Sequence, residues 1–268
     1  MPVASHAASG NLSIPWWLWP NVVALDAPAV GMIWQRFFGV VFGISIPIIV
    51  TITLGLVIWA VYLTDRWLDA APHKHHEQSE RHRFARKNRL AIGFVVILVW
   101  IIAAGFALVC VPWEGLVAGA GIAVSVAGYL ALVHFAKRTR LIAHGGKEGI
   151  VGLLFAGGVG VPLLARDANQ YIDWLPSVAA FAALCWLNCE WISCWERESL
   201  RDSAWRGWLA LAICLGLTFW VPTIMASAII PAALFLVLIH GFHDRIGLRL
   251  ARVLADLALF TPLAFLIS

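Results

Sequence analysis

The chain has 268 residues, of which 61% are hydrophobic and 13% are charged, and its formal net charge is +4. A mean hydropathy of +0.84 excludes an ordinary soluble domain and indicates a membrane protein. Because each membrane span needs about 20 apolar residues, the spans leave no room for a separate soluble domain. Nucleic-acid binding is not expected, since nearly all basic residues lie in loops between apolar segments.

The first 21 residues are predicted to form a polar and interfacial N-terminal segment. Residues 1–13 are mostly small and polar, whereas residues 14–20 contain three tryptophans and two prolines. Tryptophan favours the headgroup level of a bilayer, and proline disfavours the clean start of a span. We therefore expect a short stretch that lies on the membrane surface, followed by a single transmembrane helical domain over residues 22–268.

Apolar segments fill that domain in chain order. They cover residues 22–44, 46–66, 90–111, 115–136, 148–165, 175–195, 205–222, 223–240 and 247–267. Glycine and proline within 43–47 divide the first two segments, and Pro222 divides the seventh from the eighth. The sequence therefore predicts an all-α fold, a polytopic membrane bundle of about nine transmembrane helices.

The distribution of lysine and arginine predicts how this bundle is oriented. The loops after the second, fourth, sixth and eighth segments hold seven, four, three and three basic residues, in 66–89, 137–147, 197–206 and 245–252. Basic residues accumulate on the cytoplasmic side of short loops. We therefore predict a cytoplasmic N-terminus in a multi-pass integral membrane protein, and we expect a bacterial cytoplasmic membrane.

Two acidic residues close the second apolar segment. Asp65 and Asp69 are four residues apart, so on a helix they share one face and lie about 6 Å apart along its axis. Magnesium prefers hard oxygen ligands and commonly joins carboxylates to phosphate oxygens. The pair is therefore predicted to bind Mg²⁺ at the cytoplasmic face.

A second acidic stretch closes the sixth apolar segment and so meets the same face. Asn188, Ile192 and Glu196 follow one stripe of the predicted helix, and Glu190 lies deeper in the membrane. Charged residues within a membrane are costly unless they are paired or coordinating. Glu190 and Glu196 are therefore candidate site residues, and Arg36 in the first segment is expected to face the bundle interior or a wet cavity.

Basic residues in the loops would complete a diphosphate site on this side. The candidates are Arg81 and Arg83 after the second segment, and Lys137 and Arg138 after the fourth. Cationic donors pair strongly with phosphate oxygens. An acidic helix end combined with a basic loop therefore predicts a cradle for a diphosphate and its magnesium.

With these motifs the chain resembles the UbiA-type intramembrane prenyltransferase superfamily, whose members look like nine-helix bundles with aspartate-rich motifs after the second and sixth helices. The first family motif is NxxxDxxxD. Asp65 and Asp69 match its acidic positions, and Val61 stands at its asparagine position. The resemblance covers roughly residues 22–267 and includes the stretch from Lys147 to Gly157.

The later motifs of the family are matched in part. Asn188 and Glu196 occupy the outer positions of the second acidic motif, whereas Ile192 stands where an aspartate is usual. The family motif YxxxK after the fourth helix keeps Lys137, which Arg138 follows.

The resemblance implies transfer of a prenyl group from its diphosphate to a lipid-soluble acceptor, with magnesium. The catalytic residues that it implies are Asp65, Asp69, Asn188 and Glu196, of which Asp65, Asp69 and Glu196 would be metal ligands. Lys137 and Arg138 would hold the departing diphosphate. The membrane lipid itself is the surrounding partner, and no nucleic acid is expected.

Two other functions stay open at this point. The changes at Val61 and Ile192 fit a homologue that binds an isoprenoid or a lipid diphosphate without turning it over. A small membrane transporter is the third possibility, and Arg36, His134 and Glu190 would then be its membrane-embedded polar residues.

Overall fold

The computed structural model describes residues 15–70, 80–135, 146–165, 171–196 and 204–267, and every element in these residues is a helix. Side chains of residues 80–83, 135 and 171 are outside the description. The elements are η1 (Trp16–Leu18), α1 (Trp19–Val22), α2 (Asp26–Val41), α3 (Ile48–Asp69), α4 (Glu80–Lys87), α5 (Arg89–Cys110), α6 (Trp113–Phe135), α8 (Lys147–Val159), α9 (Val161–Leu164), α10 (Tyr171–Glu196), α11 (Trp205–Leu217), η4 (Thr218–Trp220), α12 (Thr223–Ile246), α13 (Leu248–Ala258) and α14 (Leu263–Leu266).

Every predicted apolar segment lies on one helix or on two consecutive helices. Among the described residues, α3, α5, α6, α10 and α12 are the five helices long and apolar enough to cross a membrane. The predicted breaks are confirmed: α2 ends at Val41 and α3 begins after Pro47, and Pro222 immediately precedes α12. The described part of the chain is therefore all-helical, and its five long apolar helices indicate a membrane protein.

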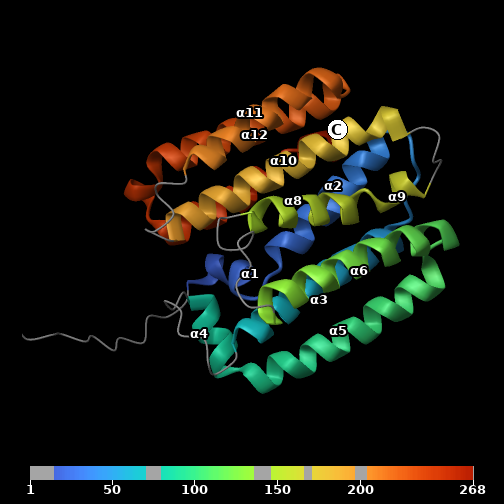
Figure 1. The fold of residues 1–268 in the computed structure, drawn as a ribbon, viewed down its shortest axis with the longest axis vertical. Coiled ribbons are helices and arrows are strands. Elements are labelled where there is room, and N and C mark those ends of the chain that lie inside the picture. Colours follow the sequence, from blue (N-terminus) through green and yellow to red (C-terminus); the bar gives the residue numbers. More distant parts are fainter. Residues whose placement is uncertain (1–14, 71–79, 136–145, 166–170, 197–203, 268) are drawn as a thin grey trace, which may run out of the picture.

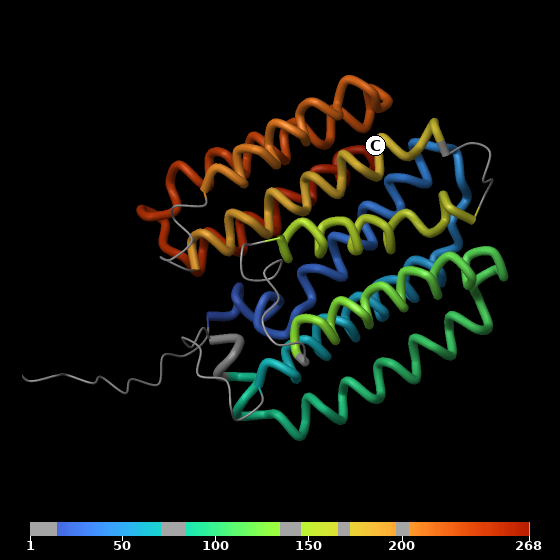
Figure 2. The backbone as a smooth tube through the Cα atoms, viewed as in Figure 1, coloured from blue at the N-terminus to red at the C-terminus, as the bar shows by residue number. Residues whose placement is uncertain are grey.

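The helices run side by side, as Figure 1 shows, with α3, α5 and α6 on one side and α10, α11 and α12 on the other. Between these groups, α2 packs on both α3 and α8, and α8 packs on α10. The tube in Figure 2 follows the chain back and forth through this arrangement. The middle helices therefore connect the two sides of the bundle.

One end of the bundle carries α1 and α4, and we call it the α4 end. The C-terminal ends of α3, α6, α10 and α12 lie here, together with the N-terminal ends of α8, α11 and α13 (Figure 1). The helix ends that flank the four basic loops are therefore on the same side of the bundle. This arrangement agrees with the alternation that the basic residues indicated.

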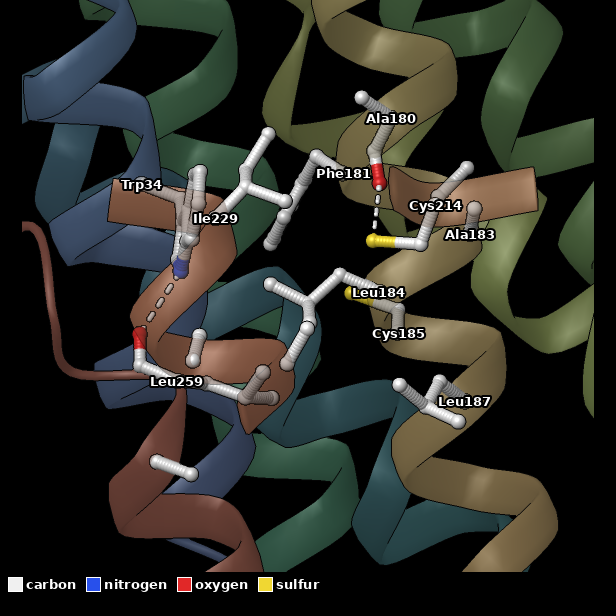
Figure 3. Close-up of a cluster of buried hydrophobic side chains, with 14 of the residues drawn as sticks. Trp34, Ala180, Phe181, Ala183, Leu184, Cys185, Leu187, Cys214, Ile229 and Leu259 are labelled. Carbon is white, nitrogen blue, oxygen red and sulfur yellow. Dashed lines mark hydrogen bonds between the residues drawn. The ribbon is translucent and has the colours of Figure 1, made fainter. Parts of the chain in front are cut away.

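The apolar core is built mainly by α2, α8, α10, α11, α12 and α13. Trp34 stacks on Phe181 with ring centroids 4.2 Å apart, and its indole Nε1 donates to the Leu259 carbonyl oxygen at 2.8 Å (Figure 3). The Trp34 donor is thereby satisfied inside the core, as a buried polar group must be. This contact joins α2, α10 and the end of α13.

The helices α5 and α6 contribute little to this core. In their most apolar stretches only 17% of α5 is buried, and none of α6. Large side chains such as Leu90, Phe94, Ile101 and Leu108 of α5 are exposed. Such a broad apolar surface is an aggregation hazard in water, whereas it suits contact with lipid.

A close approach of α8 and α10 leads to a first prediction. A Cβ atom at Gly152 would lie 2.7 Å from the Ala182 carbonyl oxygen and 2.9 Å from the Trp186 amide nitrogen. Both are backbone atoms, so relief requires the helices to separate. Gly152→Ala should therefore destabilise the protein by about 1–3 kcal/mol, measured as a lower melting midpoint in detergent micelles.

The matched control is Gly119→Ala on α6, where an added Cβ meets nothing within 4 Å. This variant should melt like the wild type. Equal midpoints for both variants would contradict the tight packing of α8 on α10.

Candidate functional site

A cavity of about 320 Å³ lies among the helices, and residues near the C-terminal ends of α3 and α10 and the N-terminal end of α8 line it. Its described lining includes the carboxylates of Asp26, Asp65, Asp69, Glu148, Glu196 and Asp256, but only three basic side chains, those of Arg66, Lys147 and Arg252. Apolar side chains of Val30, Val151, Phe155 and Leu259 form other parts of the wall. The excess of carboxylates favours the binding of a cation, and the apolar wall suits a hydrocarbon group.

The two acidic stretches that the sequence singled out meet in this cavity. Asp65 and Asp69 lie on the last two turns of α3, and Asn188, Ile192 and Glu196 lie along the C-terminal half of α10. All five residues line the cavity. Segments more than 100 residues apart in sequence therefore contribute to one site.

His134, at the end of α6, bridges the acidic pair of α3. Its Nε2 lies 3.0 Å from Asp65 Oδ1, and its Nδ1 lies 3.7 Å from Asp69 Oδ1. The histidine side chain is only 3% exposed, whereas those of Asp65 and Asp69 are 42% and 32% exposed. The imidazole therefore lies against both carboxylates, which stay partly exposed.

The residues of α10 are tied to α13, an element without a predicted site residue. Arg252 Nη1 donates to Glu196 Oε1 at 2.8 Å. One turn along α13, Asp256 Oδ1 accepts a hydrogen bond from Asn188 Nδ2 at 3.3 Å. Arg252 and Asp256 are four residues apart, and Asn188 and Glu196 are eight apart, so each pair lies on one face of its own helix.

A second amide brings the start of α2 into the same network. Asn21 Nδ2 donates to Asp26 Oδ2 at 2.7 Å and to Asp256 Oδ2 at 3.3 Å. Arg66 Nη2 of α3 donates to the Asn21 carbonyl oxygen at 2.8 Å. These bonds hold two carboxylates in place that sequence reasoning did not select.

Glu148, in the first turn of α8, is the most deeply buried carboxylate of the cavity. Its side chain is 4% exposed, and its Oε1 accepts a hydrogen bond from Ser193 Oγ at 2.9 Å. Lys147 Nζ lies 3.8 Å from the same oxygen. Sequence reasoning noted this stretch only as part of the family resemblance, so Glu148 was missed.

Two candidates from the interior of apolar segments, Glu190 and Arg36, lie outside the cavity lining. Glu190 is 1% exposed, accepts from Trp186 Nε1 at 3.2 Å and lies 3.6 Å from Arg206 Nη1. Arg36 is exposed on α2, and its Nη1 donates to the Ile46 carbonyl oxygen. Arg36 therefore does not face the bundle interior, the first of its two expected surroundings, because its long side chain reaches the connection before α3.

The predicted basic diphosphate ligands are not placed by the structure. Lys137 and Arg138 lie outside the described residues, and Arg81 and Arg83 lie on α4 with side chains outside the description. The described cations of the cavity are instead Arg66, Lys147 and Arg252. All three were counted in the sequence among the basic loop residues, and Lys147 also begins the stretch of family resemblance.

The chemistry of the donor set fits magnesium. Among the described residues, no three His, Cys, Asp or Glu side chains are grouped closely enough to hold a metal ion. Magnesium, however, commonly uses one or two carboxylates and completes its shell with water and substrate phosphates. The solvent-open carboxylates of Asp65 and Asp69 would meet that requirement.

Comparison of the chain with protein-family models, with curated proteins and with solved structures gives no match. The cavity and the residues that line it are therefore the features that bear on function.

Proposed function

We propose that this protein is a UbiA-like, magnesium-dependent membrane prenyltransferase that moves a prenyl group from its diphosphate to a lipid-soluble acceptor. In this proposal it is a multi-pass protein of about nine transmembrane helices with a cytoplasmic N-terminus. One observation carries the proposal: the acidic ends of α3 and α10 line the same cavity, together with basic side chains and an apolar wall.

In the proposed reaction the bond between the allylic carbon and the diphosphate oxygen breaks, and the electron pair leaves with the diphosphate. Lys147 and Arg252 would stabilise the charge that develops on this leaving group. Asp65 and Asp69 would hold a magnesium ion, with Glu196 as a further ligand. The bound ion would neutralise more of the charge on the leaving diphosphate.

The apolar wall would hold the prenyl chain and exclude water. Phe155 and Leu259 lie in this wall, and Tyr62 and Tyr129 line the cavity as well. Aromatic rings stabilise a nearby cation through their faces. The rings of Phe155, Tyr62 and Tyr129 would therefore stabilise the allylic cation until the acceptor forms the new bond to its carbon and loses a proton.

Binding without turnover is the second candidate function, and one observation favours it. Ile192 lines the cavity at the position where the resemblance implies an aspartate, and Glu196 already accepts from Arg252. Fewer carboxylates are then available to a metal. A transporter has less support, because Glu190 and Arg36 lie outside the cavity lining and His134 contacts the acidic pair.

The test uses purified protein in liposomes that contain a bacterial lipid extract as the source of acceptors. Labelled geranyl, farnesyl and geranylgeranyl diphosphates are supplied with Mg²⁺, and binding, release of inorganic diphosphate and uptake are measured in parallel. Magnesium-dependent release with at least one substrate supports the transferase. Binding without release supports the second candidate, and uptake of intact substrate without release supports a transporter.

A further inference from the structure

Two buried oxygens of the cavity have no hydrogen-bond partner among the described residues. They are Glu148 Oε2 and Asn188 Oδ1. The Glu148 side chain is 4% exposed and Asn188 is 5% exposed, and both residues line the cavity. Buried acceptors are nearly always satisfied, so two of them in one cavity require an explanation.

In each of the two side chains, the other polar atom already makes a hydrogen bond. The oxygen without a partner is therefore the second one of each group. Glu148 Oε1 accepts from Ser193 Oγ at 2.9 Å. Asn188 Nδ2 donates to Asp256 Oδ1 at 3.3 Å. Since each group is anchored on one side, neither can rotate to satisfy its second oxygen without losing its existing bond.

The anchor of Glu148 brings its carboxylate to α10 beside the altered acidic motif. Ser193 directly follows Ile192, which lines the cavity where the resemblance implies an aspartate. We propose that Glu148 of α8 supplies the carboxylate that position 192 lacks, and that Glu148 Oε2 and Asn188 Oδ1 are ligands of a divalent cation in this cavity.

The chemistry of the two oxygens specifies the class of cation. A carboxylate oxygen and an amide oxygen are hard ligands, which suit Mg²⁺ or Mn²⁺ and not a soft transition metal. The described lining carries six carboxylates against three basic side chains, so one further divalent cation improves its charge balance. This inference deepens the proposed function and rests on it for the role of the cation.

The experiment measures Mn²⁺ binding to the full chain in micelles by electron paramagnetic resonance, first with Mn²⁺ alone and then with inorganic diphosphate. Glu148→Gln should weaken Mn²⁺ binding by at least about tenfold, because loss of even an outer-shell partner typically costs 10–100-fold in metal affinity. Glu114→Gln is the matched control, since Glu114 is exposed in the first turn of α6, outside the cavity lining.

A second variant tests whether Glu148 takes the place of a carboxylate at position 192. Because it should restore binding, it also distinguishes loss of a ligand from loss of the fold. Ile192→Asp in the Glu148→Gln background returns a carboxylate to α10 and should recover most of the lost Mn²⁺ affinity. A melting curve of each variant, with and without Mn²⁺, reports whether the fold and its stabilisation by the cation persist.

The outcomes separate this inference from the proposed function. Wild-type Mn²⁺ affinity in Glu148→Gln would overturn the inference, while magnesium-dependent diphosphate release would still support the transferase. Conversely, Glu148-dependent Mn²⁺ binding in a protein that releases no diphosphate would uphold the cation site and reject the transferase. Absence of Mn²⁺ binding to the wild type under both conditions would overturn the cation site.

Discussion

Replacing Asp69 by asparagine should reduce magnesium-dependent diphosphate release on the order of 100-fold, the size of effect seen when one group that stabilises transition-state charge is removed. Asparagine keeps the shape of the side chain and removes its negative charge. Asp69 is 32% exposed and lines the cavity, and its buried neighbour His134 keeps the contact with Asp65 Oδ1 in this variant. The loss should therefore appear in the reaction and not in the melting midpoint.

Asp65→Asn should give a loss of similar size, because His134 bridges both carboxylates. The matched control is Asp244→Asn near the end of α12, where the side chain is 74% exposed and does not line the cavity. Release by Asp244→Asn should equal that of the wild type. Unchanged release in both Asp65→Asn and Asp69→Asn would remove the acidic pair from the proposed site.

The part of the site that could be predicted is the part that is local in sequence. The spacing of Asp65 and Asp69 places them on one face of α3 whatever the tertiary structure is, because the helix repeat alone determines it. The same holds for Asn188 and Glu196 on α10. The lysine and arginine residues in alternate loops then predicted that the C-terminal ends of these two helices lie on the same side of the bundle. Figure 1 shows this for α3 and α10.

The residues that were missed come from helices other than α3 and α10. Glu148 follows Lys147 in the first turn of α8, where an acidic residue is common because it complements the helix dipole. Arg252 and Asp256 resemble an ordinary pair of opposite charges one turn apart. Only packing against α10 gives these residues a place in the cavity, and no short-range pattern contains that information.

Arg36 was selected from the sequence, but the structure places its side chain differently from the interior position expected of it. A charge inside an apolar segment was expected to face the bundle interior or a wet cavity, because burial in lipid is costly. The break between α2 and α3 instead provides a backbone carbonyl oxygen, that of Ile46, within reach of the guanidinium. The sequence predicted the break but not the contact that it makes available.

Removing Glu196 alone should destabilise the protein by about 3 kcal/mol, near the lower end of the range for breaking a buried ion pair. Arg252 has a 4% exposed side chain and donates to Glu196 Oε1 at 2.8 Å. Glu196→Leu therefore leaves a buried guanidinium without this carboxylate. The melting midpoint in micelles should fall, and diphosphate release should fall with it.

The double variant Glu196→Leu with Arg252→Leu separates stability from function. Replacing both members of a buried pair by apolar residues is often neutral or stabilising, because neither charge then has to be desolvated. The melting midpoint should recover most of the loss, while diphosphate release should stay low because the proposed leaving-group cation is absent. Full release by this stable double variant would show that the pair lies outside the reaction.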